Sequence, residues 1–453
     1  MPAGLPTGMA PTANGRFCMP ALLACDRQPH AASCYAHCAE GLPLRAPLAG
    51  EVTTSVCVVG GGLSGLSAAL ELALAGMPVI LLEGSRLGWA ASGRNGGQVI
   101  NGYACGQPWL EARLGQDDAL RMWRWSLEGV EMIRQRCRRY AIDCDLQFGY
   151  VQVANHPRHM DALIDQVEQM ESAYQYPELT LMDRGALRYH VASDRYLGGM
   201  FDNCSGHLHP LRYTLGLAQA LEEEGGRIHE GSCVRNLDFT GGKVRVETAD
   251  GVVRCDQVVL AGNAHLGRLV PELRRKIMPV GTYMIATEPL GRRVYDVLPT
   301  GAAVCDSRHI LDYFRLSAEG RLLFGGKVSY SGWTPWRVQQ GLRRNMLKVF
   351  PHLADVRIDH CWGGLVDISR SRAPHLGRFA AGRAFYMQGF SGHGVALSGL
   401  AGRVIAEAVQ GKDRRLAVFE RLRHADFPGG SLLRRPALMA GMCAFRLRDW
   451  LPG

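Results

Sequence analysis

The stretch CVVGGGLSGLSAALELALAGMPVILLEGSRLGWAASGRNGGQ, from Cys57 to Gln98, decides the fold of this chain. An apolar strand over residues 55–59 leads into a glycine-rich turn, and an Ala/Leu-rich helix over residues 64–75 follows it. Gly76 is placed to end that helix as a C-cap residue. A second apolar strand, over residues 79–82, comes at once. The order strand, helix, strand predicts a βαβ unit and therefore an α/β fold with a parallel sheet.

The turn before the helix has the spacing GxGxxG, formed by Gly60, Gly62 and Gly65. The first glycine permits the turn, the second lets the backbone approach a pyrophosphate, and the third lets helix and strand pack closely. The helix N-terminus offers unpaired N–H groups and a partial positive charge to the phosphates. Glu83 stands at the end of the second strand, where a carboxylate accepts hydrogen bonds from ribose hydroxyls. These features together predict a dinucleotide site.

The residues after Glu83 separate the two common dinucleotides. NAD and FAD both fit the fingerprint, but a nicotinamide dehydrogenase normally continues with further αβ units. This chain continues instead as SRLGWAASGRNGGQ, over residues 85–98. Such a run offers backbone N–H groups and few obstructing side chains, which suits a loop that lies across a flat isoalloxazine ring. We therefore expect FAD.

Helical and strand patterns alternate along the rest of the chain. Helices are predicted over residues 110–140, 158–175, 336–350 and 395–409, strands over residues 150–154 and 257–260, and a hairpin that turns at Asp250–Gly251.

Motifs of one enzyme family span most of the chain. They are ASGRNGGQ (91–98), IDCD (142–145), VASDRY (191–196), GHLHP (206–210), VVLAGNAHLG (258–267), MPVGTYMIATE (278–288), ILDYFRL (310–316), MQGFSGHGV (387–395) and FPGG (427–430). In these motifs the chain resembles the D-amino-acid-oxidase superfamily of FAD enzymes and, within it, the γ-glutamylputrescine oxidase branch.

The resemblance implies a Rossmann-like FAD-binding domain of the glutathione-reductase type. A substrate domain of α+β type, built on an antiparallel sheet, would be interleaved with it. The FAD-binding domain would take residues 50–110, 207–268 and 360–425, and the substrate domain residues 140–206 and 270–358.

The resemblance also implies which residues hold FAD. For the pyrophosphate and adenosine ribose they are Gly60, Gly62, Ser64, Gly65 and Glu83, with Arg86 nearby. For the rest of the cofactor they are Ser92, Gly93, Arg94, Asn95, Gly96, Gly97, Gln98, Val234, Ala261, Gly262, Gly392, His393, Gly394 and Val395. We expect the FAD to be non-covalent, because no Cys or His stands beside Trp89 in the segment GWAASG.

The catalytic residues expected on these grounds are His393 and Arg94. A substrate that carries a carboxylate needs an arginine, for which Arg315, Arg370 and Arg372 are candidates. Tyr313 lies two residues before Arg315 on a predicted strand, the kind of element that covers the flavin in this superfamily. A structural or surface role remains the alternative for each arginine.

The implied reaction is removal of a hydride from a carbon that bears an amine. The resulting imine hydrolyses to an aldehyde and ammonia, and O2 or an electron carrier takes the electrons. γ-Glutamylputrescine or a related γ-glutamylated polyamine is the expected substrate, with O2 reduced to H2O2. Three alternatives stay open: a D-amino-acid or secondary-amino-acid dehydrogenase that reduces a quinone, a tRNA-modifying flavoprotein, and a non-catalytic assembly protein stabilised by FAD.

Composition narrows the setting. The 453 residues carry a net charge of +9, yet no dense Lys/Arg run predicts nucleic-acid binding. The 14 cysteines are scattered, which favours a reducing, cytoplasmic location, and neither a metal site nor an integral membrane segment is expected. Residues 1–45 are irregular and are expected to form a disordered leader, with a targeting segment or a later start at Met19 as alternatives. Residues 426–453 are expected to form a tail that packs on the enzyme.

Overall fold

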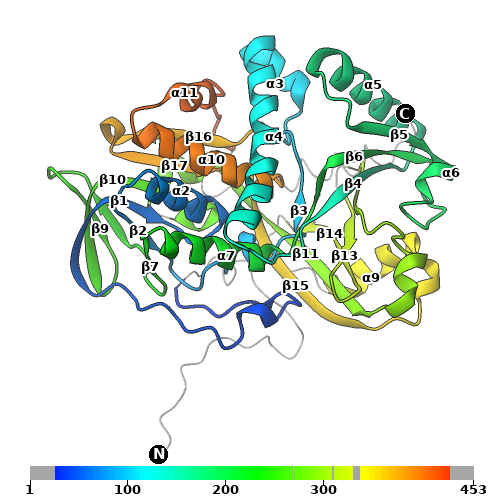
Figure 1. Ribbon diagram of the computed structural model, residues 1–453, viewed down its shortest axis with the longest axis horizontal. Helices are drawn as coiled ribbons and strands as arrows, with labels where there is room; N and C mark the ends of the chain where they lie inside the picture. The colour runs from blue at the N-terminus through cyan, green and yellow to red at the C-terminus, as the bar shows by residue number, and fades with distance from the viewer. Residues whose placement is uncertain (1–25, 268, 309–310, 330–336, 429–453) are drawn as a thin grey trace, which may run out of the picture.

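The computed structural model describes residues 26–267, 269–308, 311–329 and 337–428 of the chain. Two β-sheets lie side by side, each with its own helices, and the long helix α4 (Gln116–Arg139) stands between them (Figure 1). The chain crosses between the two sheets several times, so that neither half is one continuous segment.

The first sheet is built around β1, whose residues from Val56 to Val58 are fully buried. Buried apolar strands of this kind are typical of parallel sheets that are covered on both faces. Val56 pairs in parallel with Val79 of β2 and with Gln257 of β10. In the described residues the strand order is β16 (His375–Phe379), β17 (Ala384–Gln388), β10 (Gly251–Leu260), β1 (Gly50–Val59), β2 (Val79–Leu82) and β7 (Arg227–His229). Strand β9 (Val244–Glu247) also pairs with β10, and β8 (Asn236–Asp238) pairs with β9.

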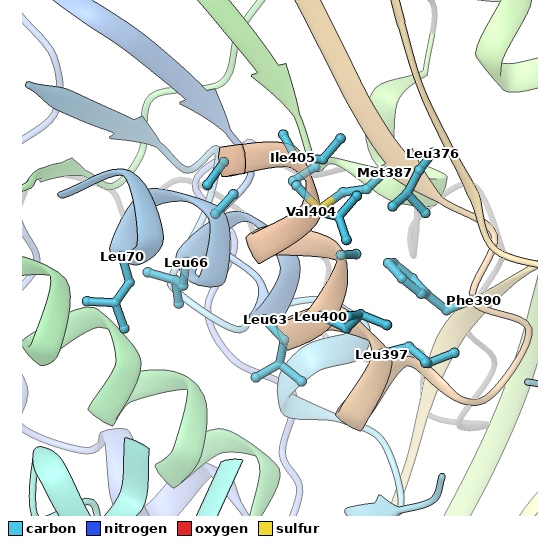
Figure 2. Close-up of a cluster of buried hydrophobic side chains, with 14 of the residues drawn as sticks. Leu63, Leu66, Leu70, Leu376, Met387, Phe390, Leu397, Leu400, Val404 and Ile405 are labelled. Carbon is cyan, nitrogen blue, oxygen red and sulfur yellow. The ribbon is translucent and has the colours of Figure 1, made fainter. Parts of the chain in front are cut away.

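Helix α2 (Leu63–Leu74) packs directly on α10 (Gly394–Val409). Small residues permit the close approach: a Cβ on Gly402 would stand only 2.6 Å from the Ala68 nitrogen. Leucines of both helices belong to one core cluster, in which Leu66 and Leu400, labelled in Figure 2, are fully buried. Truncating such a leucine to alanine costs roughly 2–5 kcal/mol. The other helices of this half are α7 (Pro210–Glu223), α8 (Pro271–Lys276) and α11 (Arg414–Glu420), with 3-10 turns at Ala91–Gly93, Asn263–Leu266 and Ala380–Gly382.

The second sheet is mostly antiparallel, with one parallel pair between β4 and β12. Its order in the described residues is β15 (Ile358–Ser369), β11 (Ile277–Pro289), β14 (Arg321–Ser329), β13 (Tyr313–Leu316), β12 (Ala303–Asp306), β4 (Gln147–Ala154), β6 (Gly198–His207) and β3 (Gln98–Val99), with β5 (Leu179–Asp183) paired to β6. The helices of this half are α5 (Pro157–Tyr174), α6 (Arg184–Leu187) and α9 (Val338–Val349), with 3-10 turns at Gly291–Asp296 and Pro351–Leu353.

Two expected boundaries differ from the structure. The helix predicted over residues 110–140 is two helices, α3 (Gln107–Leu114) and α4, because Gly115 has φ of +86° and breaks the helical path. Strand β15, expected in the FAD-binding part, pairs with β11 along the whole of the second sheet's edge. The division between the two parts therefore falls after Ser369 rather than before residue 360.

The expectation of a disordered leader is wrong for residues 26–45. This segment is irregular apart from a 3-10 turn at Ala36–Ala39, but its buried residues pack in an apolar cluster with strands β11, β14 and β15 of the second sheet and with α7. Arg27 donates its backbone N–H to the Gly84 carbonyl over 2.8 Å, and Arg45 forms an ion pair with Glu222. Tyr35 is only 1% exposed. Residues 1–25 of the expected leader and 429–453 of the expected tail lie outside the described residues.

Three further observations bear on the class of protein. Within the described ranges no helix is long and apolar enough to cross a lipid bilayer. The same residues contain no group of three His, Cys, Asp or Glu side chains that could hold a metal ion. The cysteines of that part of the chain are free thiols.

Candidate active site

The turn between β1 and α2 has room for backbone only. Gly60 has φ of +116°, which side chains rarely adopt, and a Cβ on Gly65 would stand 1.9 Å from the Gly60 carbonyl oxygen. Gly62 caps α2 without a side-chain acceptor, and the Leu63 N–H donates to Ser92 Oγ over 2.9 Å. The next N–H groups of α2 have no carbonyl within the helix to bond. They are available to an anion at this end of the helix.

A cavity of about 190 Å³ opens at the carboxyl ends of β1 and β2. Glu83 lines it, and both carboxylate oxygens are held: Oε2 accepts from the Gly61 N–H over 2.6 Å and Oε1 from the Ser85 N–H over 2.8 Å. Burial raises the pKa of this carboxyl to about 7. The other expected residues that line this smaller cavity are Gly60, Gly62, Ser64, Ser92, Asn95, Val234, Ala261, Gly262, Gly392, Gly394 and Val395.

Arg86 is placed differently from the expectation. Its Nε donates to Glu230 over 3.3 Å and its Nη2 to the Leu42 carbonyl over 3.1 Å. The guanidinium is thus engaged with a buried carboxylate and with the N-terminal segment. It is absent from the lining of both cavities described for this site.

The glycine-rich loop is held rigidly by its own side chains. The Asn95 amide donates to the Ala91 carbonyl over 2.9 Å, and its Oδ1 accepts from the Gly97 N–H over 2.7 Å. The Gln98 amide donates to the Val304 carbonyl of β12 over 2.9 Å. A Cβ on Gly96 would stand 2.7 Å from the Tyr313 ring. The loop therefore joins the two halves of the molecule, and its backbone lies close to the Tyr313 ring of β13.

Arg94 brings a positive charge to this loop. Its Nε donates to the Trp89 carbonyl over 2.6 Å and its Nη1 to the Gly363 carbonyl over 3.2 Å, while the guanidinium stands 4.7 Å from the centre of the Trp89 ring. Among the described residues it has no carboxylate partner. Burial lowers the pKa of Arg94 to about 10, so it remains a cation at neutral pH. An unpaired cation of this kind favours nearby anions and disfavours nearby cations.

The last loop leads from β17 into α10. Gly392 has φ of +99°, and His393 is the N-cap residue of the helix. Burial, and then the charge of Arg372, lower the pKa of His393 to about 4. Its Nδ1 is buried without a partner in the described part of the chain. His393 is therefore a neutral side chain near pH 7, with a ring nitrogen that has no partner among the described residues.

A second, larger cavity of about 780 Å³ meets the first at these two loops. Asn95, Gly392 and Val395 line both cavities. From there the larger cavity reaches Gln107 and Pro108 of α3 and extends along α5. The expected residues that line it are Arg94, Asn95, Gly96, Gln98, Tyr313, Arg372, Gly392, His393 and Val395. Gly65, Gly93 and Gly97 line neither cavity, because they hold the backbone of the surrounding turns.

Asp202 is a buried carboxylate on the wall of the larger cavity, only 4% exposed. Its Oδ1 accepts from the Tyr176 hydroxyl over 2.6 Å, and its Oδ2 from the Asn101 amide over 2.8 Å. It also accepts from the Ser205 hydroxyl and the Cys204 N–H. No cation pairs with it among the described residues. The carboxylate is therefore held in place by hydrogen bonds from neutral groups, and no positive charge offsets it in the described residues.

The structure separates the expected substrate residues. Arg315 is 3% exposed, and its guanidinium donates to the carbonyls of Gly96 and Leu208 beneath the glycine-rich loop. Because these hydrogen bonds engage the guanidinium, the expectation that Arg315 binds substrate is wrong. Tyr313 does line the larger cavity, and its hydroxyl lies 3.3 Å from Thr282 Oγ1. Arg372 lines it as well, is exposed, and makes none of the ion pairs described in the structure. Arg370 is exposed and lies outside that lining.

The two connected cavities fit FAD. The glycine turn leaves space that a Cβ would fill, the uncapped N-terminus of α2 can accept phosphate, and the Glu83 carboxylate keeps lone pairs for ribose hydroxyls. At the other end, α10 presents its N-terminus beside His393, whose Nδ1 has no partner in the described residues. A two-ended cofactor with a pyrophosphate and a polar ring edge matches this set of donors and acceptors.

Comparison with known proteins decides the family. Residues 55–408 match the family described as FAD dependent oxidoreductase, or DAO. The chain belongs to that family. Its members use FAD, so FAD is the cofactor, and the protein is an oxidoreductase that acts on amine donors.

The relatives of this DAO-family chain cover nearly all of its length. It is 43% identical over 424 residues to the Gamma-glutamylputrescine oxidoreductase of Escherichia coli strain K12, covering 93% of this chain and 99% of the relative. It is also 43% identical over 408 residues to the Probable oxidoreductase OrdL of Haemophilus influenzae, covering 89% and 94%. The crystal structure of glycine oxidase from Geobacillus kaustophilus is similar in fold, with a TM-score of 0.68 at 20% identity, covering 82% of this chain and 99% of that one.

Sequence reasoning missed three residues around the cavities: Asp202, Trp362 and Tyr35. A signal existed for Asp202, an acidic residue inside a strand pattern, although that pattern does not reveal what the strand faces. Trp362 lies on β15 and lines the larger cavity. Tyr35 lies in a segment that composition marked as irregular, and its contacts are with residues far along the chain.

Proposed function

We propose that this DAO-family protein oxidises γ-glutamylputrescine or a closely related γ-glutamylated polyamine. FAD, held by the turn at Gly60 and by the loops around Asn95 and Gly392, would supply the acceptor for a hydride from the carbon that bears the terminal amine. The amine nitrogen loses a proton, an imine forms, and water converts it to an aldehyde with release of ammonia. O2 then takes the two electrons and is reduced to H2O2. The support comes from the relative of 43% identity named for this activity and from the shape and charge of the larger cavity.

The observation that carries the proposal is the extent of the larger cavity. Its volume of about 780 Å³ lies within the range of roughly 300–1,000 Å³ found for sites of drug-sized ligands. It starts at the two loops expected around the flavin and continues to α3 and α5. A γ-glutamylated diamine is a long chain with an amine at one end and an amino-acid group at the other. Such a substrate can place its amine near the loops and extend its other end along the cavity.

Arg94 supports amine oxidation through its charge. The amine must be neutral, because its nitrogen lone pair assists departure of the hydride. An unpaired guanidinium in the cavity wall lowers the pKa of a nearby ammonium group, since two like charges disfavour each other. His393 is neutral and adds no opposing negative charge. The residues around the reacting amine thus favour its deprotonated form without a dedicated base.

Asp202 suits the opposite requirement, recognition of a cation. Its buried carboxylate accepts four hydrogen bonds from neutral groups, so its charge is not cancelled. We propose that its charge attracts the α-ammonium group of the glutamyl end across the cavity wall, without a direct hydrogen bond, because each of its oxygens already accepts two hydrogen bonds. Because Asp202 and Arg94 line the same cavity with opposite charges, they would orient a substrate that has two different ends.

The test is anaerobic mixing of the FAD-loaded protein with a panel of amines, followed through the visible absorbance of the flavin, and then admission of air. The panel contains γ-glutamylputrescine, putrescine, N-acetylputrescine, D-alanine and sarcosine. We expect bleaching by γ-glutamylputrescine at far lower concentration than by N-acetylputrescine, and H2O2 on aeration. Equal or better bleaching by the acetylated compound would overturn the assignment of the glutamyl group.

The second candidate is an amino-acid dehydrogenase that passes electrons to a quinone. Arg372 favours it, because this exposed arginine lines the cavity beside His393 and could hold an α-carboxylate. Bleaching by D-alanine or sarcosine without rapid return of the colour in air would select this candidate.

We place either activity in the cytoplasm, since free thiols throughout the described residues suit a reducing compartment.

A further inference from the structure

The N-terminal strap, which we define as residues 28–40, runs beneath the glycine-rich loop of residues 91–98, called the FAD-binding loop below. It lies outside residues 55–408, the part matched by the DAO family. Even so, the Gln28 N–H donates to Ser85 Oγ over 3.0 Å, at the start of the glycine-rich segment of residues 85–98. Its most buried side chain is Tyr35, which packs with Leu211 and Trp362 in one apolar cluster.

One route from Tyr35 to the loop passes through Arg315. The Arg315 Nη2 donates to the Tyr35 hydroxyl over 3.1 Å and to the Leu208 carbonyl over 2.9 Å. Its Nε donates to the Gly96 carbonyl over 2.6 Å. All these acceptors are neutral, so the buried guanidinium depends on each of them. Leu208 is in turn bonded to the loop, because its N–H donates to the Gly97 carbonyl over 2.8 Å.

A second route passes through Trp362 of β15. The Tyr35 and Trp362 rings meet edge to face, with 5.3 Å between their centres. The Trp362 Nε1 donates to the Arg94 carbonyl over 3.0 Å. Trp362 also lines the larger cavity, so any change in its position alters the cavity wall.

The two routes end on carbonyls that flank Asn95, those of Arg94 and Gly96. Fixing two carbonyls in so short a loop fixes the peptide planes between them, and with them the direction of the loop N–H groups. We propose that Tyr35 is a positioning residue for the FAD-binding loop, acting through Arg315 and Trp362. The strap then belongs to the cofactor site, and this holds whichever amine is the substrate.

The experiment compares Tyr35→Phe and Tyr35→Leu with the unchanged full-length protein. Tyr35→Phe removes only the acceptor for Arg315, and Tyr35→Leu also removes the contact with Trp362. Tyr196→Phe is the matched control, because Tyr196 is fully buried in the core of the other half and lines neither cavity. The readouts are the dissociation constant of FAD, hydrogen–deuterium exchange of residues 91–98 in the FAD-free protein, and the rate of flavin reduction at saturating substrate.

We expect Tyr35→Leu to weaken FAD binding about tenfold or more, with faster exchange over residues 91–98 in the FAD-free protein. The lost hydrogen bond to the charged Arg315 contributes part of this change, and the lost ring contact with Trp362 contributes the rest. Tyr35→Phe should give a smaller change in the same direction, and the reduction rate should fall with little change in KM. Tyr196→Phe should alter none of these.

A double-mutant cycle tests the route through Arg315. If Tyr35 acts through this arginine, Tyr35→Phe should have little further effect on FAD affinity in an Arg315→Met background. The proposal is overturned if Tyr35→Leu keeps FAD affinity and exchange within twofold of the unchanged protein, or if the cycle is additive. Should Tyr35→Leu fail to fold, Tyr35→Phe decides: unchanged exchange over residues 91–98 would refute the positioning role.

Discussion

FAD affinity is expected to rise as the pH increases from 6 to 8, because the cofactor site contains a carboxyl that titrates in this range. Glu83 lines the smaller cavity, and burial raises its pKa to about 7. The ionised carboxylate keeps a free acceptor site on each oxygen after bonding the Gly61 and Ser85 N–H groups, whereas protonation covers one of the sites that the ribose hydroxyls would use. Binding of FAD should therefore favour the ionised form and release a proton.

The size of the effect follows from that pKa. The carboxyl is about 10% ionised at pH 6 and about 90% ionised at pH 8, so the affinity should increase about tenfold over this interval. The sign for stability is opposite in the FAD-free protein. There the raised pKa means that the folded state binds the proton more tightly than the unfolded chain does. The contribution of Glu83 to stability is then largest below its unfolded pKa and is lost as the pH rises through about 7.

The assay is titration of FAD-free protein with FAD at pH 6, 7 and 8, followed by the quenching of flavin fluorescence. Glu83→Gln should bind FAD more weakly at pH 8 and lose most of the pH dependence. Asp367 needs its own control, because it lines the same cavity, accepts from the Gly389 N–H and has a pKa that burial raises to about 7. Asp367→Asn should retain the tenfold change if Glu83 is responsible. A flat affinity from pH 6 to 8 in the unchanged protein would refute the reasoning.

Three further predictions concern single residues. Gly65→Ala should abolish FAD binding, because the added Cβ would stand 1.9 Å from the Gly60 carbonyl oxygen. Gly242→Ala is the control: its added Cβ has no atom within 4 Å, so this variant should purify with its flavin absorbance intact. Arg94→Met should raise by about one unit the apparent pKa of the substrate amine in the pH profile of anaerobic flavin reduction, because a like charge near the ammonium group is lost. Arg94→Lys keeps the charge and is the control; identical profiles for the two variants would contradict this role. Asp202→Asn should raise the KM for γ-glutamylputrescine about tenfold and leave that for N-acetylputrescine unchanged, and a parallel rise for both would show that Asp202 does not attract the glutamyl ammonium.

The parts of the fold that sequence predicts are those with local causes. The helix after Gly60 is found within a residue of its expected bounds, and the strand before it ends at Val59 as expected, because the apolar pattern and the glycines act over short distances. That strand begins at Gly50, five residues earlier than predicted. Strand β15 was assigned to the wrong half, since an apolar strand pattern does not specify its partner, and only pairing with β11 settles it.

The candidate site divides in the same way. Glu83 lines its cavity because its place is fixed by the βαβ unit alone. Arg315 was misjudged because residue type and strand position indicate a guanidinium but not its surroundings, which include a tyrosine 280 positions earlier. Asp202 was missed for the reverse reason: nothing in the sequence around it indicates that Asn101 and Tyr176 will hold it on a cavity wall.

The pairing of β1 with β10 has a consequence for synthesis of the protein. Val56 pairs with Gln257, and α2 packs on α10, which begins only at Gly394. A ribosome therefore exposes the complete glycine turn long before it makes the partners of that turn, and contacts so distant in the chain form slowly. The smaller cavity is complete only after nearly the whole polypeptide has emerged, because Gly392, Gly394 and Val395 line it. Chains that stop before α10 should accumulate as colourless, aggregation-prone fragments, because the face of α2 that packs on α10 would then stay uncovered.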